Sequence, residues 1–257
     1  MALVVPVLVG ACATSSSVES RDVVRPAGNE AGDPDRRAQV RLELASLYFG
    51  RGQYSTALDE VRQALAARPD LPEGHGLRGL ILAAMGEVSA AEDSLRRAIQ
   101  LAPNDGGALH NHGWFLCQQR RYGDAEKQFN AALALPQYRD GVRTMLAQGV
   151  CQARAGRLQE AERSLSRSFE LDPANPVTAF NLSEVLLQRG ELERARFYVL
   201  RIHAVPELVS AQSLWLLARI ENRMGNALAA RTVGQQLRDR FPQSAETLRF
   251  ERGTFDD

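Results

Sequence analysis

The chain has 257 residues, and its 31 basic and 31 acidic side chains give a formal net charge of zero. The basic residues are interspersed with acidic ones and form no stripe or basic aromatic cluster, which argues against a nucleic-acid partner. A chain of this length exceeds the usual size of a single core, unless the fold grows by adding layers.

The N-terminus begins with a short apolar run over residues 1–11, which Cys12 follows. The run is too short to span a bilayer, which takes about 20 residues, but it fits the core of a signal peptide. The segment Val9-Gly10-Ala11-Cys12 resembles a bacterial lipobox, in which the chain is cleaved before the cysteine and lipid is attached to it. We therefore expect residues 1–11 to be a lipoprotein signal peptide and Cys12 to be the lipidation site. A cysteine that follows an apolar leader by chance is the alternative.

No lysine or arginine precedes the apolar run, so we expect the true translation start to lie upstream of Met1. Ala13 stands where aspartate, by resemblance to known lipoproteins, would retain the protein at the inner membrane. The expected location is therefore the periplasmic face of the outer membrane, with a lipid anchor. Residues 12–37 combine Ser, Thr, Gly, Pro and charged residues without a helical period, and they are predicted to form the lipidated cysteine and a flexible tether.

From residue 38 to 245 the sequence repeats about every 34 residues. The first copy contains Gly52, Tyr54, Ala57, Val61, Ala64 and Pro69, and the second repeats the pattern with Gly86, Val88, Ala91, Leu95, Ala98 and Pro103. Six copies cover residues 38–71, 72–105, 106–139, 142–175, 176–209 and 211–244. The remaining residues, 246–257, are predicted to be a C-terminal tail.

Each copy is predicted to fold as two helices joined by a turn. The eighth position of the first helix is small in every copy, so the two helices can cross with their backbones close together; it holds Ala45, Gly79, Gly113, Gly149, Ser183 and Ala218. Glycine supplies the backbone angles of the turn, and proline ends the second helix. The pattern resembles the tetratricopeptide repeat, whose units must stack on neighbours to bury their apolar faces. The expected fold class is all-α, a right-handed α-solenoid of six such repeats.

In this repeat family, positions 2, 5, 9 and 12 of the first helix line a concave groove. In the first three copies these positions include Leu42, Ser46, Phe49, Leu80, Ala83, His110, Trp114 and Cys117. They predict an apolar trough with aromatic anchors, suited to an apolar helix face or an extended apolar segment of a partner protein. In later copies the groove positions include Arg143, Leu146, Val150, Phe180, Glu184, Leu187, Trp215 and Arg219. For each aromatic residue, packing between repeats is the alternative.

Cys117 and Cys151 are separated by one repeat length. Adjacent first helices pack side by side in a solenoid, so the two sulfurs could meet, and we expect a disulfide in the oxidising periplasm. Two buried thiols are the alternative. His110 and His112 point to nearly opposite sides of a helix and cannot easily share a metal ion. Because no phosphate loop or nucleophile motif is present, we expect a protein-binding adaptor, not an enzyme, without metal, cofactor or small-molecule substrate.

Four short segments carry a closer resemblance. The third copy reads Asn-His-Gly-Trp-Phe-Leu-Cys over residues 111–117, and the fourth has Gly-Val-Cys over 149–151. Residues 213–216 read Ser-Leu-Trp-Leu, and residues 236–242 read Gln-Leu-Arg-Asp-Arg-Phe-Pro. With six repeats behind a lipobox, these segments closely resemble the type IV pilus biogenesis and stability lipoproteins, the PilF/PilW pilotins. The departures are the missing charged leader and His112, where the family often has tyrosine.

The resemblance covers nearly the whole chain and implies a specific role. It implies an outer-membrane pilotin that binds the type IV pilus secretin subunit and promotes its outer-membrane localisation and multimerisation, with the cysteine pair bridged. Two other roles use the same repeats: a lipoprotein accessory of outer-membrane β-barrel protein assembly, and a scaffold for cell-wall enzymes. Secretin loss from the outer membrane on deletion would select the pilotin role, and general porin loss the role in β-barrel assembly.

Overall fold

The structure, a computed structural model, describes residues 33–255, and within them it contains helices and no strand. The signal peptide predicted over residues 1–11, the lipidation site Cys12 and most of the predicted tether lie outside the described residues. No helix within residues 33–255 has the length and apolar character that a membrane span requires. The elements are α1 (Pro34–Gly50), α2 (Tyr54–Ala67), α3 (Pro72–Ala84), α4 (Val88–Leu101), α5 (Gly106–Gln118), α6 (Tyr122–Leu133), α7 (Gly141–Arg154), α8 (Leu158–Leu171), α9 (Pro176–Gln188), α10 (Leu192–His203), the 3-10 turn η1 (Pro206–Leu208), α11 (Ala211–Arg223), α12 (Ala227–Arg240) and α13 (Ala245–Arg252).

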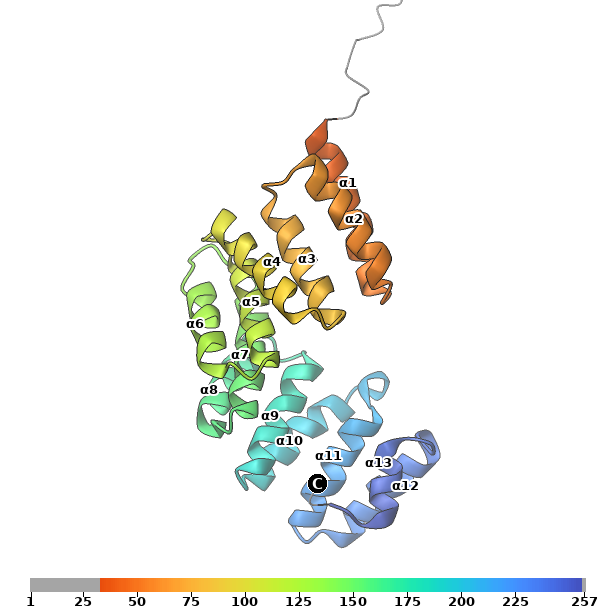
Figure 1. The fold of residues 1–257 in the computed structure, drawn as a ribbon. Coiled ribbons are helices and arrows are strands. Elements are labelled where there is room, and N and C mark those ends of the chain that lie inside the picture. The colour runs from red at the N-terminus through yellow and green to blue at the C-terminus, as the bar shows by residue number, and fades with distance from the viewer. Residues whose placement is uncertain (1–32, 256–257) are drawn as a thin grey trace, which may run out of the picture. The chain divides into compact units, whose positions relative to one another are not determined.

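Helices α1 to α12 form six hairpins of two consecutive helices each. The first helix of every hairpin also contacts the first helix of the next one, from α1 and α3 through to α9 and α11. Figure 1 shows the hairpins following one another in chain order, from the red α1 to the blue α12. The all-α repeat fold predicted from the 34-residue period is therefore confirmed. Helix α1 begins at Pro34, ahead of the predicted start at residue 38, because proline is favoured in the first turn of a helix.

The small residues at the eighth position allow the two helices of a hairpin to touch. A Cβ atom built on Gly79 would lie 2.6 Å from Leu95 Cγ and 3.1 Å from the Ala91 carbonyl oxygen. Gly149 repeats this contact in the fourth hairpin, 2.6 Å from Leu165 Cγ. Both leucines are fully buried, so a larger residue at either glycine would displace the core of its hairpin.

The turn between the two helices of a hairpin needs one residue with left-handed backbone angles. Glycine takes this place in five hairpins, at Gly52, Gly86, Gly156, Gly190 and Gly225. In the third hairpin the same place is held by Arg120, with φ of 59°. Left-handed backbone angles cost a residue with a Cβ atom about 1 kcal/mol. The turn of the third hairpin is therefore strained, and the turns of the other five hairpins are not.

Residues 246–257, which the sequence predicted to be a tail, instead contain most of helix α13. Ser244 caps the helix by accepting a hydrogen bond from the Thr247 amide at 3.1 Å, and Gly253 ends it with φ of 69°. Helix α13 contacts both α11 and α12, and Phe250 lies directly over Gly234. The last hairpin is thus covered on its open side, as the end of a solenoid must be when its apolar face has no following repeat.

Candidate functional site

At the N-terminal end of the predicted groove, a hollow of about 660 Å³ lies between α1 and α3, here called the front hollow. It is lined by Gln39, Leu42, Glu43, Ser46, Leu47, Glu73 and Leu77. The structure therefore brings Leu42 and Ser46 together as predicted groove residues, with Leu42 buried in the floor. Leu47, which is 59% exposed, was missed because it follows a groove position without occupying one. The sequence feature that could have identified Leu47 is an apolar residue directly after the groove residue Ser46.

The other predicted residues of the first two repeats lie beside this hollow. Phe49 is half-buried and its ring centroid lies 5.8 Å from that of Tyr54. Leu80 and Ala83 are also half-buried on α3, and Ala83 packs against the core. None of the three lines the front hollow.

A second hollow of about 370 Å³ lies between α5, α7 and α9, and we call it the middle hollow. It is lined by the apolar residues Trp114, Leu146, Ala147, Val150 and Val177 and by the polar residues His110, Arg143, Arg154 and Asn181. Trp114 is half-buried and Val177 is exposed. The predicted aromatic anchor Trp114 thus does face an open apolar surface, with the later groove residues Leu146 and Val150 beside it.

His110 contributes to the middle hollow mainly as a packing residue, since it is only 4% exposed. Its Nδ1 atom lies 2.9 Å from Thr144 Oγ1, and the Tyr138 hydroxyl lies 2.8 Å from the same oxygen. Burial, together with the nearby Arg143 guanidinium, lowers the pKa of His110 to about 4. The ring is therefore neutral at pH 7, and the expectation that it would be an accessible groove contact is corrected because α7 covers it.

The cysteine pair ties together the two helices that form the middle hollow. Cys117 on α5 and Cys151 on α7 are joined by a disulfide, with Cα atoms 5.8 Å apart. Both residues are buried, so Cys117 does not offer the groove contact that its position in the repeat predicted. By chain entropy, a bridge that closes a loop of this length contributes roughly 3 to 4 kcal/mol to stability.

Two arginines on α7 stand at the ends of the middle hollow. The Arg154 guanidinium carbon lies 5.1 Å from the Trp114 ring centroid, within range of a cation–π interaction. Both Arg143 and Arg154 are exposed, and within residues 33–255 neither makes an ion pair. Sequence reasoning placed Arg143 in the groove but missed Arg154, because Arg154 lies beyond the last groove position of its repeat.

The rear of the groove is occupied by the protein itself. Arg219 Nη1 lies 3.1 Å from Glu184 Oε1, and Arg223 donates a hydrogen bond to the Leu187 carbonyl oxygen at 3.2 Å. Burial raises the pKa of Glu184 despite the neighbouring guanidinium. Leu187 is buried, and Trp215 is covered by the C-terminal segment. These two groove predictions are therefore corrected to core packing, and the accessible groove lies in the first five repeats.

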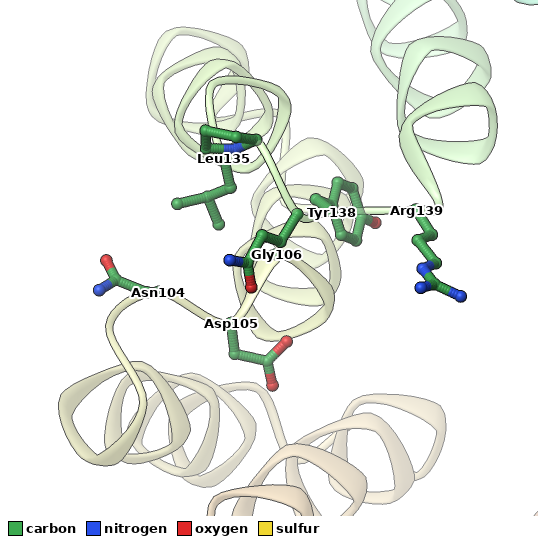
Figure 2. Close-up of a pocket in the computed structure, with 8 residues that line it drawn as sticks. Asn104, Asp105, Gly106, Leu135, Tyr138 and Arg139 are labelled. Carbon is green, nitrogen blue, oxygen red and sulfur yellow. The ribbon is translucent and has the colours of Figure 1, made fainter.

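A further hollow of about 660 Å³ lies at the loop edge, between the start of α5 and the segment before α7 (Figure 2). Tyr138 packs over Gly106, where a Cβ atom would lie 2.4 Å from the ring. Asp105 caps α5 by accepting a hydrogen bond from the Gly107 amide at 2.8 Å. The repeat pattern did not predict this hollow, because Tyr138 and Arg139 precede an insertion between the third and fourth copies. Asp105 caps α5 and the Tyr138 hydroxyl bonds Thr144 of α7, so both side chains hold the loops that enter these helices.

Comparison with known proteins supports the architecture. Residues 42–106 and 112–176 match one model of the tetratricopeptide repeat, and residues 152–204 match a second. The type IV pilus assembly protein PilF of Pseudomonas aeruginosa is 25% identical over 219 residues, which are 85% of this chain and 86% of PilF.

Solved structures give the same result. The crystal structure of PilW, described as a widely conserved type IV pilus biogenesis factor, superimposes with a TM-score of 0.77 at 29% identity and covers 82% of this chain and 96% of its own. A structure of Pseudomonas aeruginosa PilF gives a TM-score of 0.72 at 23% identity, covering 86% of this chain and 99% of its own, and shows the shared fold. Since the repeat models match more than half of the sequence and the structure stacks the corresponding helix pairs, the chain belongs to the tetratricopeptide repeat family.

Proposed function

We propose that this protein is a type IV pilus pilotin, an outer-membrane lipoprotein that binds the secretin subunit and promotes its localisation and multimerisation. The observation that carries the proposal is the extent of the similarity to PilF and PilW. It covers 85% of this chain and 86% of PilF, and 82% of this chain and 96% of the PilW structure. The likeness to the PilW structure joins this coverage to 29% identity and a TM-score of 0.77.

The concave surface supports a role in binding. Exposed apolar side chains stand at the front and middle hollows, with Leu47 at the first and Val177 at the second. An apolar groove of this kind takes an apolar helix face or an extended segment, because burying those side chains removes apolar area from water. We infer that the protein acts as a binding adaptor rather than an enzyme.

A matched pair of leucine substitutions tests this role. Leu47→Lys places a charge at the rim of the front hollow, and Leu228→Lys places the same charge on α12, where Leu228 is 80% exposed. Both leucines are largely solvated, so both variants should keep their helical circular dichroism. We expect only Leu47→Lys to reduce secretin multimers in the outer membrane, since docking of an apolar partner would remove water from the charged ammonium group. Equal multimer levels in the two variants would contradict docking at the front hollow.

The Leu80→Lys and Trp114→Glu variants extend the test along the groove. Both residues are half-buried, so the amount of helix is measured first. Folded variants that still assemble full secretin multimers would place the partner elsewhere. A deletion strain that keeps its secretin but loses porins in general would instead favour a role in β-barrel assembly.

The membrane anchor is tested separately. Without the Cys12 thiol no diacylglycerol can be attached, so Cys12→Ser should release the protein from outer-membrane fractions. A variant that stays with the outer membrane after a high-salt wash would contradict the lipoprotein proposal.

A further inference from the structure

Helix α7 presents a stripe in which two cations bracket two apolar side chains. Arg143, Leu146, Val150 and Arg154 all line the middle hollow. The two arginines are separated by about three helical turns, so they lie on the same side of the helix and about 16 Å apart. Trp114 on α5 and Val177 on α9 flank the stripe and widen its apolar centre.

The arginines of this stripe make no ion pair within the described part of the chain, although Asp140 at the start of α7 acts beside Arg143 on His110 and Tyr138. No carboxylate is among the residues that line the middle hollow, and neither Arg143 nor Arg154 makes an ion pair within residues 33–255. His110, with a pKa of about 4, adds no charge at pH 7. Arginine stays protonated at any physiological pH, so the middle hollow carries two positive charges around an apolar floor.

The other regions of the groove differ in charge. The front hollow has Glu43 and Glu73 among its lining residues and no arginine or lysine. At the rear, Arg219 is paired with Glu184. The unpaired arginines are therefore a local property of the middle hollow and do not reflect a general excess of cations along the groove.

The position of Arg154 also favours an anion as its partner. Its guanidinium lies over the face of Trp114, which holds the planar group in place. A guanidinium fixed in this way can donate two parallel hydrogen bonds to a carboxylate at a smaller entropic cost than a mobile lysine.

We propose that the middle hollow binds a protein segment in which apolar side chains are flanked on both sides by carboxylates. An extended segment advances about 3.3 Å per residue, so its two acidic residues would stand about five positions apart to reach both arginines. The proposal rests on the proposed function in identifying that segment as part of the secretin subunit. The chemistry of the segment follows from the hollow alone.

A peptide selection tests this chemistry without assuming the identity of the partner. The purified full-length chain is panned against a displayed library of random peptides of about 12 residues, long enough to span both arginines when extended. We expect the enriched peptides to carry Asp or Glu on both sides of an apolar centre. The double variant Arg143→Glu/Arg154→Glu should bind those peptides at least about tenfold more weakly and should select Lys or Arg at the flanking positions.

The matched control reverses two exposed arginines away from the groove. Arg163 on α8 and Arg231 on α12 are exposed, and Arg163→Glu/Arg231→Glu changes the net charge by the same amount as the test variant. This control should select the same peptides as the parent. Enriched peptides without acidic flanks, the same peptides from the test variant, or no enrichment at all would each contradict the proposal.

Secretin assembly measured in the same variants separates the two proposals. Loss of secretin multimers in Arg143→Glu/Arg154→Glu, with normal multimers in the control, would support both. Normal multimers together with the expected change in selected peptides would leave the middle hollow as an acidic-segment site and remove the secretin as its partner. Unchanged peptides with lost multimers would contradict the proposed chemistry and keep the proposed function.

Discussion

The ring of Trp215 stacks on that of Phe255, with centroids 5.3 Å apart and planes inclined by 23°. Trp215 stands at a groove position of the sixth repeat, yet it is only 5% exposed. The C-terminal segment therefore covers the concave surface of the last repeat as well as its open side. Phe250 takes part in the same cluster, 5.7 Å from Phe255 in an edge-to-face arrangement.

Removing this cover should expose Trp215. In a Trp114→Phe background, where Trp215 is the remaining tryptophan of the two in the chain, truncation after Ser244 should shift the fluorescence maximum to longer wavelength and lower the stability of the last repeat. The loss should be a few kcal/mol, since burying each phenylalanine contributes about 1.5 to 3 kcal/mol. An unchanged emission maximum would show that α11 is covered without the C-terminal segment.

The strained turn at Arg120 predicts a stabilising substitution. Arg120→Gly should stabilise the protein by about 0.5 to 1 kcal/mol, because the relief of the left-handed strain exceeds the greater freedom of glycine in the unfolded chain. The matched reverse change is Gly156→Arg, where φ is 75° and an added Cβ atom would meet nothing within 4 Å. It should destabilise by about 1 kcal/mol. Denaturant unfolding measures both changes. If the free energy of unfolding changed in the same direction in both variants, the turn at Arg120 would not be strained.

The bridge between α5 and α7 should stabilise the repeats that form the middle hollow. Reduction should lower the melting temperature by about 10 °C, as expected for roughly 3 to 4 kcal/mol in a chain of this size. The Cys117→Ala/Cys151→Ala variant should show the lower melting temperature under both conditions. Two thiols that are freely alkylated in the denatured, unreduced protein would rule the bridge out.

His110 predicts a loss of stability in mild acid. Its pKa is lowered to about 4 in the folded protein by burial and by Arg143, whereas in the unfolded chain it titrates near 6.5. Below pH 6.5 the unfolded state thus binds more protons, and stability falls until the pH reaches about 4, by about 3 kcal/mol in all. His110→Gln should remove this part of the pH dependence.

The remaining pH dependence of the His110→Gln variant has further sources, two of which are histidines. Burial also lowers the pKa values of His112 and His203, so a weaker loss of stability in the same direction should persist. Urea unfolding at pH 7 and pH 4.5 measures the difference. The same loss in parent and variant would show that His110 is protonated in the folded protein.

The period and the small residues of the sequence were enough to predict the helix pairs. Gly149, for example, lies against Leu165 of the following helix, and the absence of a Cβ atom allows the two helices to pack closely. The end of the solenoid was not predicted in this way: α13 begins 34 residues after the start of α11, but it is short, and no second helix follows it within the described residues. Phe250 packs on Gly234 and Phe255 stacks on Trp215, and these contacts cannot be read from the repeat pattern.

The candidate site was predicted in part. Groove positions follow from the helical period, so Leu42, Ser46 and Trp114 were found. Whether the side chain at a groove position is buried depends on contacts with the next repeat, and the 34-residue period does not predict those contacts. His110 is covered through Thr144, and Leu187 is buried in the core. Whether an arginine is paired is likewise a property of the folded surface, as the contrast between Arg154 and Arg219 shows.

Site-specific photo-cross-linking in the cell envelope shows directly whether the groove holds the secretin subunit. A photoreactive amino acid is placed at Leu47 in the front hollow, at Val177 in the middle hollow, and at Leu228 on α12 as the control, all three being exposed. We expect irradiation to join the secretin subunit to the protein at Leu47 and Val177 but not at Leu228. Cross-links to the secretin at Leu228 alone, or to other proteins at both groove positions, would contradict this expectation.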